Sequence, residues 1–186
     1  MTDEDFMKLL FPEVLMKKIE IKEVTPCLSE PDRIKFLAQT DKPINDILPV
    51  LYLYISNARY SEKLGALSYI HHQHLVTMFS TGKIGMTYVK DREEAEQLVA
   101  EAKDLINRAF TNLKSHGKPH EKLFELKKQA TLIRLYEKLP KTNCKECGEE
   151  GCYVFGVKLL SGEKDLRQCP HADVGELERI LHPIRI

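Results

Sequence analysis

The sequence predicts an α+β protein in which a larger domain of strands and helices precedes a small helical domain rich in cysteine. Between residues 34 and 112, short apolar segments typical of strands are combined with segments that have the 3.6-residue period of helices. Residues 115–120, Ser-His-Gly-Lys-Pro-His, have the composition of a linker. Beyond this linker lie four of the five cysteines. We therefore expect one domain over residues 1–114 and a second over residues 121–186.

The first domain is expected to begin with a helix over residues 2–19, followed by an irregular segment over residues 20–32 that contains Pro26. Pro43 suits the first turn of the next helix, and Pro49 is expected to kink it. From residue 34 onward the expected order is β-α-β-β-β-α. These elements cover residues 34–38, 43–55, 66–70, 74–80, 83–89 and 91–113.

The clearest helix is expected to begin after Asp91 and to end near Leu113. Asp91 can cap it, with Glu94 three residues on in an arrangement similar to a capping box. Apolar residues then recur at the helical period. In the second domain, a further helix from about Glu121 to Leu139 is expected to lead into the cysteine-rich segment.

One pattern in the first domain resembles a repeat of the TATA-box-binding protein fold. It consists of Phe79-Ser-Thr-Gly-Lys-Ile84, then a strand, then Lys90-Asp-Arg-Glu-Glu-Ala95. That repeat has a strand, a tight turn, a second strand and a helix with an acidic cap. The resemblance implies the topology alone, because one copy is visible where that family uses two, and because the net charge of the chain is zero.

Composition places the chain among ordinary globular proteins, with 42% hydrophobic and 30% charged residues. A net charge of zero lacks the basic excess of a polyanion-binding domain, so nucleic acid is not expected as a partner. No apolar run approaches the roughly 20 residues needed to span a bilayer. The acidic N-terminus lacks the order of a signal peptide, so we expect a cytoplasmic protein without a membrane partner. In that compartment, clustered cysteines favour metal ligands over disulfides.

The cysteines follow the spacing C-x2-C-x4-C-x16-C, with a proline after the last one. A cubane [4Fe–4S] cluster needs four converging thiolates, and C-x2-C brings two of them to adjacent irons. Gly148 and Gly151 are placed to let the backbone approach the sulfides of such a cluster. We therefore predict a [4Fe–4S] cluster held by Cys144, Cys147, Cys152 and Cys169.

Structural zinc is the competing interpretation of the same cysteines. Zinc sites built from four cysteines usually contain two C-x2-C pairs, whereas this chain has one pair and two separate cysteines. A disulfide framework is a further alternative, which a reducing compartment disfavours.

The segment also carries a more specific resemblance. Leu139-Pro-Lys-Thr-Asn-Cys-Lys-Glu-Cys-Gly-Glu149, Val157-Lys-Leu-Leu-Ser-Gly-Glu163 and Cys169-Pro170 resemble the four-cysteine domain of the corrinoid iron–sulfur protein large subunit and of the Rnf complex B subunit. The resemblance implies that the four cysteines ligate a [4Fe–4S] cluster that passes single electrons, in one case to a cobalt corrinoid. Most of the chain also resembles small archaeal and bacterial iron–sulfur proteins.

The predicted function is therefore one-electron transfer to a protein redox partner, such as a corrinoid protein of anaerobic metabolism or another low-potential metalloenzyme. The alternative is a non-catalytic binding or redox-sensing module whose cluster, or zinc ion, is structural. A third hypothesis is an enzyme subunit completed by a partner chain. We find no P-loop, dinucleotide fingerprint or Ser/His/Asp set, so the chain is not expected to be an enzyme by itself.

Several other residues have competing interpretations. Cys27 is expected to be a buried side chain and not a fifth ligand. His72 and His74 are expected to share one side of a strand and His71 the other, with no nearby carboxylate, so these histidines are expected to be solvent-exposed. His171 is placed to lie near the cluster and is otherwise exposed.

Overall fold

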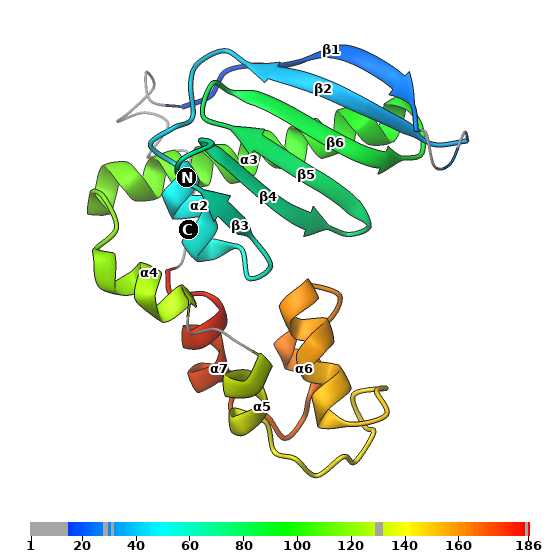
Figure 1. Ribbon diagram of the computed structural model, residues 1–186, viewed down its shortest axis with the longest axis vertical. Helices are drawn as coiled ribbons and strands as arrows, with labels where there is room; N and C mark the ends of the chain where they lie inside the picture. Colours follow the sequence, from blue (N-terminus) through cyan, green and yellow to red (C-terminus); the bar gives the residue numbers. More distant parts are fainter. Residues whose placement is uncertain (1–14, 28–29, 31, 129–131, 185) are drawn as a thin grey trace, which may run out of the picture.

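The computed structural model describes residues 15–27, 30, 32–128, 132–184 and 186, and it confirms the α+β class. Its centre is a six-stranded antiparallel sheet with the order β1-β2-β6-β5-β4-β3 (Figure 1). The strands are β1 Ile19–Pro26, β2 Ile34–Thr40, β3 Arg59–Ser61, β4 Ala66–His71, β5 His74–Phe79 and β6 Lys83–Val89. The helices are α2 Leu48–Tyr54, α3 Arg92–His116, α4 Glu121–Lys128, α5 Leu132–Lys138, α6 Cys152–Ser161, α7 Val174–Leu181 and the 3₁₀ turn η1 Leu166–Gln168.

The two edge strands were not expected. β1 occupies much of the segment predicted to be irregular, and it pairs antiparallel with β2 from Ile19 opposite Thr40 to Pro26 opposite Ile34. Pro26 is compatible with this because it ends an edge strand, where its missing N–H removes no interior hydrogen bond. The short β3 forms the opposite edge of the sheet. The helix predicted over residues 2–19 lies largely outside the described residues, and its last residue, Ile19, begins β1.

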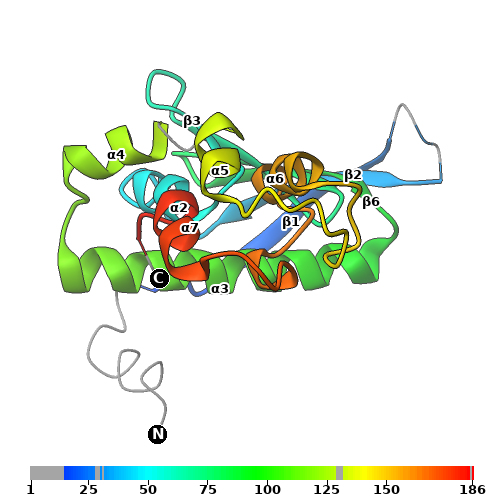
Figure 2. The same cartoon turned by 90° about the horizontal axis from the view of Figure 1, so that it is seen from below.

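Helices α2 and α3 cover one face of the sheet. Both contribute to the same buried apolar cluster as the inward side chains of the strands, and Figure 2 shows α3 running along one side of the sheet. In β5, Val76 and Met78 are buried in this cluster. Leu75 lies on the opposite face of the same strand and is exposed.

The prolines and the cap of α3 explain where these helices begin. α2 begins at Leu48 and not near Pro43, and Pro49 lies in its first turn, so the predicted kink is wrong. A proline there loses no helical hydrogen bond, because N–H groups of the first turn lack intrahelical partners. Asp91 caps α3 as predicted, accepting a hydrogen bond from the Glu94 N–H at 2.9 Å. α3 continues to His116, three residues past the predicted end.

The C-terminal helices build a second, smaller apolar cluster below the sheet in Figure 1. Its buried members come from α5, α6, α7 and η1 and include Phe155 and Leu177. One side chain joins the two parts directly: Nδ2 of Asn57 donates to the carbonyl oxygens of Ile70 in β4 (2.8 Å) and Ser161 in α6 (2.7 Å). Among the described residues, no helix is both long and apolar enough to cross a membrane.

Candidate metal centre

The loop between α5 and α6, which we call the cysteine loop, carries the first two predicted ligands. Cys144 is exposed and Cys147 is half-buried on this loop, whereas Cys152 is the buried first residue of α6. Cys169 directly follows η1 and is also buried. Cys152 and Cys169 belong to the second apolar cluster, and Cys147 packs against it. The fold therefore brings together three cysteines that are up to 22 positions apart in the sequence.

The loop backbone turns repeatedly through the left-handed region. The φ angles are 59° at Lys141, 49° at Asn143, 66° at Lys145 and 80° at Gly148. Such angles are uncommon outside glycine, and they make the backbone turn sharply. Turns of this kind can direct N–H groups at an anionic group, and hydrogen bonds from N–H groups to cluster sulfur lower the cost of holding its negative charge.

Asn143 fixes the position of Cys152. Its Oδ1 accepts a hydrogen bond of 2.9 Å from the backbone N–H of Cys152, which otherwise has no intrahelical partner. The capping residue itself, Gly151, has no side chain that could do this. A Cβ atom added at Gly151 would lie 2.9 Å from Asn143 Oδ1, closer than normal packing allows. Asn143 and Gly151 therefore fix Cys152 at the N-terminal end of α6, which is the positive end of the helix dipole.

A buried carboxylate holds the rest of the loop against α6. The side chain of Glu149 is 7% exposed and lies 2.8 Å from Lys158 Nζ and 3.2 Å from Lys164 Nζ. Lys164 Nζ also donates to the carbonyl oxygen of Cys147 at 3.3 Å. The hydrogen bond from Lys158, assisted by Lys164, lowers the pKa of Glu149 despite its partial desolvation. Glu149 is therefore a carboxylate at neutral pH, and it links the cysteine loop to the last turn of α6 and to Lys164 beyond that helix.

His171 is exposed, and it lies beside Cys144, the exposed predicted ligand. Its ring nitrogen, the Cys144 sulfur and a carboxylate oxygen of Glu146 all lie within 4.8 Å of one another. His171 Nε2 is 3.3 Å from Glu146 Oε2. Because His171 follows Cys169 by two residues, this contact places Cys144 beside the segment that carries the fourth cysteine.

The residues present fit an iron–sulfur cluster. Cysteine sulfur is the ligand that such clusters use, and four cysteines are supplied by the loop, the first residue of α6 and the residue after η1, beside an apolar cluster. The sequence motif contained Asn143, Glu149 and Lys158 without giving them a role. Their contacts depend on tertiary structure, and a side-chain acceptor shortly before the first cysteine was the only sequence signal for Asn143.

The remaining cysteine and the histidines depart from expectation. Cys27 is half-buried, not buried, and lines a cavity with Phe36 at the β1–β2 side of the sheet, apart from the cysteine loop. His74 is buried, with Nδ1 3.1 Å from the carbonyl oxygen of Tyr88. His71, and not His72, lies opposite His74 across β4 and β5, so the prediction that His74 shares a side with His72 and not with His71 is wrong. The turn between the strands moves His72 out of the strand pattern.

Comparisons with known proteins match the C-terminal part of the chain. Residues 139–171 match a family model described as "Putative Fe-S cluster". Gamma subunits of the acetyl-CoA decarbonylase/synthase complex are 40% identical over 52 residues in Methanocaldococcus jannaschii and 41% identical over 58 residues in Methanothermobacter thermautotrophicus. These matches cover 28% and 30% of this chain and 11% and 13% of the relatives.

The corrinoid/iron-sulfur protein large subunit of Moorella thermoacetica is 44% identical over 41 residues, which is 22% of this chain and 9% of that subunit. The chain thus spans about a tenth of the length of the curated relatives it matches. No solved structure matches the chain, so the resemblance to a TATA-box-binding protein repeat stays a prediction. Residues 139–171 are an iron–sulfur domain similar to one in these relatives, and the chain is an iron–sulfur protein.

Proposed function

We propose that Cys144, Cys147, Cys152 and Cys169 ligate one [4Fe–4S] cluster and that the protein transfers single electrons to a protein partner in the cytoplasm. The proposal is supported by the placement of the four cysteines: Cys152 and Cys169 belong to the small apolar cluster, Cys147 packs against it, and Cys144 lies beside His171. One relative is named a corrinoid/iron-sulfur protein, which supports a corrinoid protein or another low-potential metalloenzyme as the partner. When bound, the cluster supplies a centre that accepts and donates one electron at a time.

The chain's own residues account for two requirements of electron transfer. Burial of Cys152 and Cys169 against Phe155 and Leu159 excludes water from one side of the ligand set. Exposure of Cys144 leaves the other side close to the surface, where a partner can approach. Lys145 beside Cys144 is also exposed and offsets part of the negative charge of four thiolates.

Anaerobic reconstitution with iron and sulfide tests the proposal. We expect about four iron and four sulfide per chain, and a low-temperature EPR signal of a reduced [4Fe–4S] cluster that disappears and returns on oxidation and reduction. Substitution of serine for any of Cys144, Cys147, Cys152 and Cys169 is expected to abolish or strongly reduce the content of cluster. Cys27→Ser is the matched control and should retain it. A colourless protein holding one zinc ion per chain in the cysteine loop would contradict the proposal.

A structural or redox-sensing cluster is the second candidate function. It is supported by the two cysteines that form part of the small apolar cluster, because a bound metal group there would hold α6 and η1 together. The same EPR experiment separates a structural cluster from a redox-active one. A cluster that cannot be reduced and reoxidised reversibly favours the structural role, whereas a reversible couple fits electron transfer or redox sensing.

A further inference from the structure

The turn between β4 and β5 holds two histidines side by side. β4 ends at His71 and β5 begins at His74, so His72 and Gln73 form a two-residue hairpin turn. His72 has a φ of 54°, which hairpin turns require but which is uncommon for a residue with a side chain. This turn brings the ring centroids of His71 and His72 to 4.3 Å from each other. Both side chains remain accessible to solvent.

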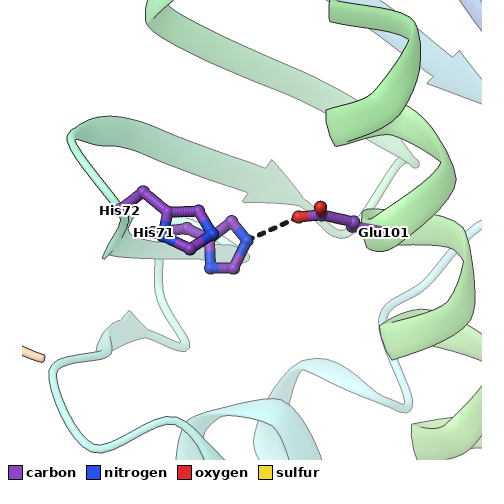
Figure 3. Close-up of side chains that lie close together, drawn as sticks. All are labelled: His71, His72 and Glu101. Atoms are coloured by element: carbon purple, nitrogen blue, oxygen red, sulfur yellow. Dashed lines mark hydrogen bonds and ion pairs between the residues drawn. The ribbon is translucent and has the colours of Figure 1, made fainter. Parts of the chain in front are cut away.

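Helix α3 supplies the carboxylate that the sequence did not show near these histidines. Glu101 lies 30 positions from His71 in the sequence, yet its Oε2 is 2.7 Å from His71 Nε2 (Figure 3). His71 lies on the face of the sheet that α3 covers, since it follows the buried Tyr69 at the two-residue period of β4. One nitrogen from each histidine and one oxygen from Glu101 lie within 4.8 Å of one another.

The neighbouring His74 is occupied by other contacts. Its Nδ1 is paired with the carbonyl oxygen of Tyr88, and its Nε2 lies 3.7 Å from Glu94. It is also buried, whereas His72 and Glu101 are exposed. The fold therefore separates a buried structural histidine from a solvent-accessible group of two imidazoles and one carboxylate.

Two imidazoles and one carboxylate form a donor set for a divalent transition metal ion. Zn²⁺ bonds imidazole nitrogen and carboxylate oxygen at about 2.0–2.2 Å, so tetrahedral ligand atoms lie about 3.3–3.5 Å apart. The three atoms here lie within 4.8 Å of one another, so they must move closer to hold an ion, and the exposed side chains of His72 and Glu101 can do so without disturbing the core. Three protein ligands leave one tetrahedral position open.

The open position would face a cavity. His71, His72 and Glu101 all line a cavity of about 560 Å³, whose wall also includes Arg108 of α3 and His182 after α7. A small anion or a water molecule could complete the coordination sphere from this side. The donors are nitrogen and oxygen, whereas the cysteine loop offers sulfur, so the two sites differ in the metals they favour.

We propose that His71, His72 and Glu101 form a second metal site, which binds one divalent transition metal ion of the zinc type with an open position toward the cavity. This site is independent of the proposed electron-transfer function, because none of its residues belongs to the cysteine loop. His71 ends β4, His72 lies in the hairpin turn and Glu101 lies in α3. A bound ion would therefore also link the tip of that hairpin to the helix.

Isothermal titration of the cluster-loaded protein with Zn²⁺ under anaerobic conditions tests the site. We expect one Zn²⁺ per chain, with affinity reduced at least tenfold by His72→Ala and by Glu101→Gln. His116→Ala and Glu96→Gln are the matched controls, since each alters an exposed residue of α3 away from the site. Both control variants should bind Zn²⁺ like the parent protein.

Zinc K-edge X-ray absorption separates this site from the cysteine loop. A first coordination shell of nitrogen and oxygen alone, with the visible absorption of the iron–sulfur cluster unchanged, is the expected result. Sulfur in the zinc shell would show that the ion enters the cysteine loop and would overturn the proposal. Equal affinity in the parent and in His72→Ala, or no binding at all, would overturn it as well.

Discussion

Lys127 shows at the residue scale how one side chain joins the two parts of the molecule. It is 5% exposed, and its Nζ donates to the carbonyl oxygens of Ile55 at 2.8 Å and Leu181 at 3.0 Å. Ile55 is the C-cap of α2, and Leu181 is the last residue of α7, so the amine satisfies acceptors at two helix ends. Burial lowers the pKa of Lys127 from 10.5 to about 8.

This pKa predicts an alkaline rise in stability. Between pH 8 and 10 the unfolded chain still holds the proton that folded Lys127 loses, so the free energy of unfolding should increase by about 2 kcal/mol. Below pH 8 both states are protonated and the cost of burial is constant. Chemical denaturation at several pH values measures the rise.

Lys127→Met should remove this rise, and Lys128→Met is the control, because Lys128 is exposed and hydrogen-bonded to Glu125. The series should stop at pH 10. Burial raises the pKa of the neighbouring Tyr52 above 10, and ionisation of Tyr52 would oppose the rise. An equal slope in the parent and in Lys127→Met would contradict the assignment.

At the scale of elements, the ends of α3 and α6 offer a direct comparison. Both helices end at a glycine with a positive φ. Gly117 has a φ of 73° and a ψ of −169°, and Gly162 has the left-handed conformation, with a φ of 77° and a ψ of 11°. A Cβ added at Gly117 meets nothing within 4 Å, whereas one added at Gly162 would lie 2.7 Å from Nδ2 of Asn57. The same substitution therefore tests backbone strain at one site, and strain together with a contact between the two parts at the other.

Gly117→Ala is expected to reduce the free energy of unfolding by about 1–3 kcal/mol from backbone strain alone, because its φ and ψ lie in a region nearly restricted to glycine. Gly162→Ala should cost about 1–2 kcal/mol for its left-handed backbone and about 1 kcal/mol more, because displacement of Asn57 removes its hydrogen bond to Ser161. Urea unfolding of both variants measures the losses. A loss in Gly162→Ala no larger than the cost of its left-handed backbone would show that the Asn57 contact does not contribute to stability.

At the scale of the whole molecule, we propose that residues 1–114 and 121–186 are separate domains joined by residues 115–120. Two buried apolar clusters support this division, one around the sheet and one around the cysteines. The two parts also contact each other near the C-terminal end of the chain, where Ile184 and Ile186 pack against the first cluster.

Chelation of the iron from the cluster-loaded protein tests the division. Loss of the cluster should accelerate amide hydrogen exchange within residues 139–171 by at least tenfold, because the cluster no longer links the cysteines of α6 and of the segment after η1. β5 and β6 in the sheet should keep their protection. Hydrogen exchange followed by mass spectrometry measures both regions. Equal acceleration in the sheet would show that the two parts unfold as one unit.

Much of this organisation could be predicted because it depends on local chemistry. The spacing of the four cysteines indicated their shared role, the apolar period indicated α3, and Asp91 marked where that helix begins. Edge strands were harder to predict. β1 contains exposed polar residues on a strand with one neighbour, so its sequence lacks the pattern of a buried strand.

The sequence by itself determined the α+β class and the iron–sulfur domain, because the thiol donors, their spacing and the helical period are properties of the chain. Tertiary structure alone decided which distant groups meet. It brought Asn143 into hydrogen-bonding contact with the backbone of Cys152, Lys164 into contact with that of Cys147, and Glu101 of α3 into contact with His71. The physical reason is that such contacts depend on how the loops turn and on which helix covers which face of the sheet.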